Sequence, residues 1–369
     1  MTYLNNLPFH QNINKIVPYL LLILFFLLLA GCKTAPADNN LVEFGEFQQE
    51  ITLKEEPVEW IEVYRYGGLA IFENLIVVID LNGDHLFKVY NLDTKAFMGS
   101  FGARGKGPDE FAFTPEFTSV YTVQNGEIIF QLYDLGTKTV SNIRLMESLA
   151  AKRPILTSKH KLPEDLNFDQ VAQLNDSAFI GTKGDVLIAY NPRTGMTEEK
   201  SRPLEFTQSL PDRINLYAHF SNMELSMQYG RITICYLFVK RIHLYSFDGS
   251  LTSIIKEKGD QRLNTSSDDI YEAGNTIYFV NTYMGKNHLL ALNQNRKAME
   301  NKPGELWLFD YQGNPLSKYH LDCWISGGAM DWRTGTFYAT NVDEKQMISF
   351  NLIQGIITRD LLSSSTKPD

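Results

Sequence analysis

Cysteine is scarce in this chain, which has only three among 369 residues. Cys235 and Cys323 lie in separate apolar segments, ITICYLF and LDCWI. No two cysteines have the close spacing of a structural metal site. An exported protein could oxidise them to a disulfide, but we expect both thiols to be buried as small hydrophobic groups. The third, Cys32, follows an apolar run near the N-terminus.

Positive charge is also in deficit. Lys and Arg number 34 against 43 Asp and Glu, so the formal net charge is −9. Nucleic-acid binding requires a basic footprint, and so does attachment to anionic lipid headgroups. The composition therefore argues against a nucleic-acid partner and against membrane attachment through charge.

Helical periodicity and recognised catalytic motifs are missing too. Hardly any segment has apolar residues at i, i+3 and i+4 over a dozen positions, so little helix is expected. The best helical candidate is the polar stretch 288–301. The chain has neither an HExxH metalloprotease motif nor a Gly-x-Ser-x-Gly turn. An enzyme is therefore less expected than a binding protein, although catalysis stays open.

The N-terminus has the pattern of an export signal. Residues 1–31 contain an uninterrupted apolar core from Tyr19 to Ala30, well short of the ~20 residues of a spanning helix. The run ends in Leu29-Ala30-Gly31-Cys32, which resembles a bacterial lipobox. The resemblance implies cleavage before Cys32 and acylation of its thiol, which would anchor the protein to a membrane. The alternatives are an uncleaved anchor and a soluble secreted protein.

The residues after Cys32 suggest where this anchor lies. Residues 32–45 are polar at first and are expected to form a tether. Lys33 follows the cysteine, where some bacteria place an inner-membrane retention signal of the Asp type. We therefore expect the outer membrane, with its periplasmic and surface leaflets both open.

A short repeat supplies the architecture. Six β-type runs each end in an aromatic residue followed by Asn or Asp, and successive pairs lie 43, 57, 57, 62 and 41 residues apart. These intervals are typical of β-propeller blades with loops of uneven length. The six pairs are Tyr90-Asn91, Tyr133-Asp134, Tyr190-Asn191, Phe247-Asp248, Phe309-Asp310 and Phe350-Asn351.

We therefore predict an all-β fold, a six-bladed propeller of four-stranded antiparallel blades over residues 46–360, followed by a polar tail, 361–369. In blade one the expected strands are 69–73, 75–80, 85–90 and 97–101. The Asn or Asp of each pair should start the turn between the third and fourth strands, where its side chain can bond the backbone. Residues 47–54 are expected to close the ring by pairing with 347–350 as the outer strand of blade six.

The segment between blades one and two, Phe101-Gly-Ala-Arg-Gly-Lys-Gly-Pro-Asp-Glu-Phe111, resembles the FGxxGxGPxEF signature of the TolB-like six-bladed propeller lipoproteins and of related NHL-like propellers. This resemblance implies a fold and a location but no general activity. Arg104, Lys106, Asp109 and Glu110 are candidate binding residues, since glycines let backbone amides approach an anion. The structural alternative is a crossover anchored by Phe101 and Phe111, with Glu110 capping backbone amides.

A metal site in the central channel is the main catalytic possibility. Carboxylates from several inner strands would suit Ca²⁺, and NHL-type lyases hold a metal with channel histidines, of which this chain offers only His219. The alternative is an acidic, solvated channel without a bound ion. The candidate ligands are Asp169, His219, Asp268 and Asp331, with Glu224 and Asp269 as further channel acids.

Long loops favour a binding function. The longest connections, 102–116, 147–168, 197–218 and 282–304, are all expected on the face that carries the loops between second and third strands and between blades. Two of them are basic, with Lys152 and Arg153 in one and Lys286 and Arg296 in the other. We predict an envelope-anchored, non-catalytic module that binds a protein or a glycan through this face. A metal-dependent lyase or hydrolase and a scaffold in an envelope complex are the alternatives.

Overall fold

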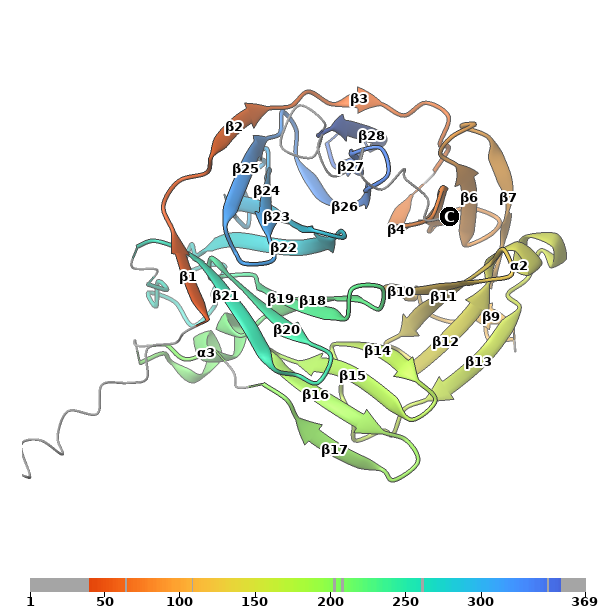
Figure 1. The fold of residues 1–369 in the computed structure, drawn as a ribbon, viewed down its shortest axis with the longest axis horizontal. Helices are drawn as coiled ribbons and strands as arrows, with labels where there is room; N and C mark the ends of the chain where they lie inside the picture. Colours follow the sequence, from red (N-terminus) through yellow and green to blue (C-terminus); the bar gives the residue numbers. More distant parts are fainter. Residues whose placement is uncertain are drawn as a thin grey trace, which may run out of the picture. The chain divides into compact units, whose positions relative to one another are not determined.

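A computed structural model describes residues 40–352, apart from residues 64, 108, 202, 203, 207, 208, 260, 261 and 344. The predicted signal peptide (1–31), the lipidation site Cys32 and the polar tail (361–369) lie outside the described residues. From Val42 onward the chain belongs to one unit, in which six blade sheets are arranged around a centre (Figure 1). A further two-stranded sheet pairs β8 (Ala103–Arg104) with β9 (Glu110–Phe111). Among the described residues no helix is both long and apolar enough to cross a membrane.

The first three blades have four antiparallel strands each, in sequence order from the centre outward. Blade 1 comprises β4 (Tyr66–Phe72), β5 (Leu75–Asp80), β6 (Phe87–Asn91) and β7 (Phe97–Phe101). Blade 2 comprises β10 (Glu116–Gln124), β11 (Glu127–Asp134), β12 (Thr139–Arg144) and β13 (Leu156–Lys161). Blade 3 comprises β14 (Gln170–Asn175), β15 (Ala178–Lys183), β16 (Val186–Asn191) and β17 (Met196–Glu199).

The last three blades each add a strand from the N-terminal segment at the outer edge. Blade 4 comprises β18 (Ser221–Ser226), β19 (Arg231–Tyr236), β20 (Arg241–Ser246), β21 (Leu251–Glu257) and β1 (Leu41–Phe44). Blade 5 comprises β22 (Thr276–Met284), β23 (His288–Lys297), β24 (Glu305–Asp310), β25 (Pro315–His320) and β2 (Gln49–Thr52). Blade 6 comprises β26 (Ile325–Asp331), β27 (Thr336–Asn341), β28 (Gln346–Asn351) and β3 (Glu56–Pro57).

The predicted six-bladed, all-β architecture is confirmed. Blade 1 shows the two local features, a buried strand and a hydrogen-bonded turn, from which it could be predicted. Its second strand, LIVVID, is buried at every position because neighbouring blades cover both faces of the sheet. At the end of its third strand, the side chain of Asn91 accepts hydrogen bonds from the backbone N–H groups of Asp93 and Thr94, both at 2.9 Å. Asn191, Asp248 and Asp310 make the same type of turn bond in blades 3, 4 and 5.

One repeat departs from this rule. Tyr133-Asp134 ends the second strand of blade 2, β11. Of the other five pairs, four end third strands, and Phe247-Asp248 directly follows the third strand β20. Asp134 still accepts a hydrogen bond from the backbone N–H of Thr137 at 3.0 Å. The motif therefore marks a tight turn after a strand and does not by itself identify which strand of the blade it ends.

Ring closure by the two chain ends is confirmed, but the predicted residues were wrong. The outer strand of blade 6 is Glu56–Pro57, which pairs antiparallel with β28. Residues 49–52, expected there, pair in parallel with β25 of blade 5 instead. Residues 42–44, predicted to be tether, belong to β1 on the outer edge of blade 4. We call residues 42–57 the N-terminal strap, because they follow the outer edges of three blades (Figure 1).

Two short helices were not predicted, and the predicted helix was wrong. Residues 288–297 form β23, whereas the helices among the described residues are α2 (Leu145–Ala151) and α3 (Asp212–Ala218). The long connections 147–168 and 282–304 were also misassigned, since they contain β13 and β23. Of these four stretches, 102–116 and 197–218 are mainly inter-blade connections, and a further long connection joins β21 of blade 4 to β22 of blade 5. We call the face that carries these connections the loop face.

Candidate functional site

The glycine-rich segment after blade 1 is a crossover anchored by Phe101 and Phe111, as the structural alternative expected. The ring of Phe87 stacks on Phe101 at a centroid distance of 5.0 Å and meets Phe111 edge-on at 5.4 Å. The Glu110 carboxylate accepts a hydrogen bond from the backbone N–H of Gly107 at 2.8 Å. A Cβ at Gly105 would lie 1.9 Å from that carboxylate, so the glycine leaves room for the acid. The loop amides are thus already engaged by the chain itself.

Replacing Glu110 by alanine is therefore expected to lower the free energy of unfolding by about 0.5–1.5 kcal/mol, the typical worth of such a bond. The exposed Arg104 offers a matched control, and Arg104→Ala should change stability by less than about 0.5 kcal/mol. Denaturant unfolding of both variants is the measurement. Equal losses in the two variants would contradict a capping role for Glu110.

The structure joins two of the basic and acidic candidates. Arg153 Nη1 lies 2.9 Å from the carboxylate of Asp109, so the crossover is tied to the segment after α2. Arg104, Lys106 and Lys152 are exposed. Because the guanidinium group of Arg153 already pairs with Asp109, it is less available to bind an anionic ligand.

The second predicted basic loop is divided by the fold. Lys286 lies in the hairpin between β22 and β23, whereas Arg296 lies near the far end of β23, where Lys297 pairs with Thr276. A strand of this length spans about 30 Å, so the two cations cannot share a ligand. Arg296 also donates to the backbone carbonyls of Ala298 and Glu300 and stacks on Trp324. It orders the loop that follows β23.

The four metal candidates do not converge. Asp331 is buried and accepts hydrogen bonds from Arg333 and Thr334. Asp169 accepts a hydrogen bond from the backbone N–H of Gly184 at 2.6 Å, and Asp268 is exposed in the 266–274 turn. Within the part of the chain that the structure describes, the one group of three potential ligands is Glu55, Asp322 and Cys323. No local sequence pattern indicates this group, because Glu55 lies in the strap whereas Asp322 and Cys323 lie more than 260 residues later, between β25 and β26.

His219 meets a partner that the sequence analysis also missed. It follows α3 directly, and its Nδ1 lies 3.0 Å from a carboxylate oxygen of Asp185. Asp185 is almost fully buried in the hairpin after β15 and also accepts a hydrogen bond from the backbone N–H of Leu204. The buried carboxylate thus lies within ion-pair distance of a partly exposed imidazole, although the angle between them is not that of a hydrogen bond. Such an arrangement orients a histidine.

Glu224 is the channel acid with the strongest perturbation. It lies on β18, the inner strand of blade 4, and accepts a hydrogen bond at 2.6 Å from Ser119 Oγ on β10, the inner strand of blade 2. Burial raises the pKa of the Glu224 carboxyl from 4.5 to about 8, and the Ser119 bond opposes only part of the shift. The side chain keeps some exposure to the channel. Blades 2 and 4 therefore touch directly across the centre (Figure 1).

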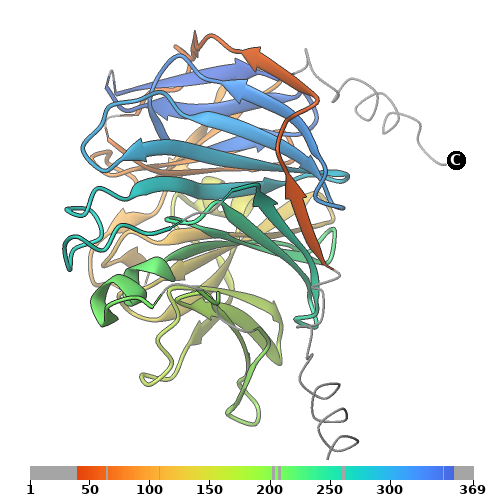
Figure 2. The same ribbon diagram turned by 90° about the vertical axis from the view of Figure 1, so that its left-hand side faces the viewer.

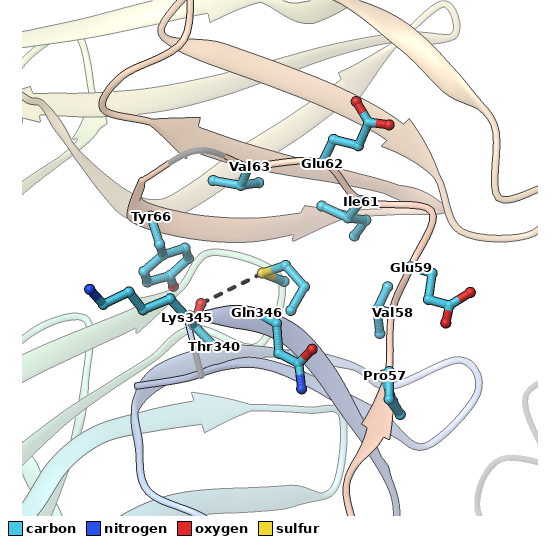
Figure 3. A pocket seen from close by; sticks show the side chains of 11 residues that line it. Pro57, Val58, Glu59, Ile61, Glu62, Val63, Tyr66, Thr340, Lys345 and Gln346 are labelled. Atoms are coloured by element: carbon cyan, nitrogen blue, oxygen red, sulfur yellow. Dashed lines mark hydrogen bonds between the residues drawn. The ribbon is translucent and has the colours of Figure 1, made fainter. Parts of the chain in front are cut away.

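A pocket of about 360 Å³ opens where the ring closes (Figure 3). One wall is the segment that leaves the strap, including Val58, Ile61 and Val63, and the other is the turn before β28. Tyr66 points into the space, whereas the carboxylates of Glu59 and Glu62 point away from it (Figure 3). Its volume is at the lower end of ligand sites, and few polar groups converge in it.

Exposed apolar side chains gather in another part of the loop face. The cap, which we define as α3 with residues 262–275, covers a buried cluster that includes Ile214, Phe238 and Ile270. On its outer side Leu216 is 64% exposed, Tyr271 39% and the adjoining Phe220 38%. In the view of Figure 2, α3 projects from the blades at the edge of the molecule. Large apolar groups this exposed, and this close together, are typical of interaction surfaces.

Comparison with solved structures supports the fold. A member of the DUF4221 family from Bacteroides vulgatus is 9% identical, with a TM-score of 0.54, and the match covers 81% of this chain and 95% of that one. A putative exported protein from Bacteroides fragilis is 11% identical, with a TM-score of 0.50, and covers 84% and 98%. At these identities the likeness shows the fold alone. No curated protein matches the chain.

The sequence also matches a family model. The model described as TolB-like 6-blade propeller-like matches residues 64–331, which run from the start of blade 1 to the first strand of blade 6. This stretch is well over half of the chain, and it contains the crossover signature. The chain therefore belongs to the TolB-like six-blade propeller family.

Proposed function

We propose that this protein is a non-catalytic binding module of the cell envelope that contacts another macromolecule through the cap on its loop face. The observation that carries the proposal is the exposed apolar group Leu216, Phe220 and Tyr271. Aromatic and aliphatic side chains of this kind supply the core of protein interfaces, where a few of them carry most of the binding energy. The lipobox-like Leu29–Cys32 segment supports a lipid anchor at Cys32 and hence the envelope location.

The chemistry of the cap indicates the class of the partner. An apolar surface favours a protein partner over a glycan, and a permanent place in an envelope complex is the second candidate function. The lyase or hydrolase alternative has only the His219–Asp185 pair in its favour. Asp268 and Asp331, two of its candidate ligands, are separated by the fold.

Site-specific photocrosslinking in intact cells tests the proposal. A benzoylphenylalanine at position 216 is expected to capture a discrete partner, because Leu216 is 64% exposed on α3. The matched control is position 196, since Met196 is 69% exposed on the outer strand of blade 3. Sensitivity of the adduct to protease or to glycosidase identifies its class. No adduct at 216, or the same adducts at both positions, would overturn the proposal.

A further inference from the structure

The cap combines its apolar surface with an uneven distribution of charge. Its two segments, 212–218 and 262–275, carry two guanidinium groups and four carboxylates: Arg213, Arg262, Asp212, Asp268, Asp269 and Glu272. Arg213 is held among its own neighbours, since a hydrogen bond with Tyr217 and the charges of Asp269 and Asp268 raise its pKa. The cap therefore carries a formal charge of −2, on a protein whose net charge is −9, and the Nζ of Lys297 lies beside it at Gly274.

Three aromatic rings of this surface form a connected group that is supported by the buried core. The rings of Tyr217 and Phe220 meet edge-on at 5.1 Å, Tyr217 lies 6.3 Å from Tyr271, and Tyr271 lies 5.4 Å from the buried Phe238. Phe238 belongs to the cluster that α3 covers. A surface anchored in this way presents fixed aromatic rings to a partner, so little conformational entropy is lost on binding.

We propose that the cap docks a cationic, apolar polypeptide segment, one that places aliphatic or aromatic side chains on Leu216, Tyr217, Phe220 and Tyr271 and Lys or Arg beside the surrounding carboxylates. This inference rests on the proposed binding function and names its partner class. Charge complementarity decides the choice: an acidic protein segment or an anionic glycan would meet like charge at the rim, which costs affinity and slows association.

The test uses two synthetic 14-residue peptides of equal length and leucine content, one of Leu and Lys and one of Leu and Glu. Fluorescence anisotropy is measured with purified residues 33–369. The Leu/Lys peptide is expected to bind with an affinity that falls as salt rises, and the Leu/Glu peptide to bind at least 10-fold more weakly. Equal binding of both peptides, or binding of neither, would overturn the inference.

Paired variants distinguish binding of the peptide at the cap from nonspecific attraction to a negatively charged protein. Leu216→Ser with Tyr271→Ser should weaken binding at least 10-fold without altering charge, and Asp268→Asn with Glu272→Gln should reduce the salt dependence. Met196→Ser and Asp176→Asn are matched exposed controls on blade 3 and should leave binding unchanged. Thermal unfolding confirms that each variant is folded. Equal affinity in cap and control variants would overturn the inference.

The two proposals fail differently. A glycan adduct at position 216 in cells would leave the proposed binding function standing and would refute the polypeptide partner. Absence of any adduct at 216, together with cap-dependent binding of the Leu/Lys peptide, would refute the cellular role and leave the chemical preference of the cap intact.

Discussion

Replacement of Glu224 by glutamine is expected to raise the free energy of unfolding by about 2–4 kcal/mol at pH 8 and by no more than about 1 kcal/mol at pH 5. The reason is the raised pKa of this carboxyl, about 8 in the folded protein against an ordinary value of 4.5. At a pH between these two pKa values, the Glu224 carboxyl has lost its proton in the unfolded chain but keeps it in the folded protein. Stability therefore falls as pH rises through this window, and a glutamine cannot titrate.

The size of the expected stabilisation follows from the shift in the pKa of Glu224. One pKa unit corresponds to about 1.4 kcal/mol, and the partial exposure of Glu224 to the channel places the effect below the full value for the shift. Glutamine keeps the shape of the side chain, and its amide oxygen can still accept the bond from Ser119. The stabilisation should therefore come from removing the titration rather than from new packing.

Denaturant unfolding at pH 5, 6.5 and 8 is the measurement. Glu199→Gln is the matched control, because Glu199 is exposed on β17, and its stability curve should run parallel to that of the unchanged protein. If the Glu224→Gln curve were also parallel, the carboxyl would not be held protonated in the channel. A carboxyl whose burial lowers the stability of the folded protein is typical of a functional position.

The second large effect is expected at the strap. Phe44→Ala should lower the free energy of unfolding by about 3–5 kcal/mol, the usual cost of removing a buried phenylalanine. Phe44 is 6% exposed, and its ring packs edge-on against Phe309 at 5.4 Å and Trp307 at 5.8 Å. Its carbonyl also accepts a hydrogen bond from the backbone N–H of Lys258 at 2.7 Å. The residue thus joins the strap to blades 4 and 5.

Loss of this contact should also free the strap from the outer edges that it covers. Limited proteolysis of Phe44→Ala is expected to cut first between β1 and β2, within residues 45–48. Phe97→Ala is the control, since Phe97 is 56% exposed on β7, and the expected loss is under about 1 kcal/mol. A loss no larger in Phe44→Ala than in Phe97→Ala would mean that the strap contributes little to stability.

Much of the fold could be predicted because its contacts are local. Strands β4 to β7 follow one another directly in the chain and pair with their sequence neighbours, so residues 66–101 carry their own pattern. The prediction failed where that locality ended. The stretch 288–301 is the best helical candidate in the sequence, yet residues 288–297 form β23 because β22 and β24 pair with them on both sides.

The candidate site was less predictable than the fold. Glu110 was a candidate binding residue, with capping as the structural alternative, and that alternative could be foreseen because its partner Gly107 is three residues away. The pairing of His219 with Asp185 and of Arg153 with Asp109 spans 34 and 44 residues, and no local pattern records it. Leu216, Phe220 and Tyr271 are common residues in two distant segments. Only α3 packing over Ile270 brings them onto one surface.

The sequence by itself determined the number of blades, their turns and the family, since these depend on strand propensity and on hydrogen bonds over two or three residues. The tertiary structure alone decided which blades the strap covers, that Ser119 and Glu224 meet across the channel, and that an acidic, apolar cap forms on the loop face. These features depend on packing between residues about 50 to more than 250 positions apart. Such contacts are specified by the shapes of whole blades and leave no periodic trace in the chain.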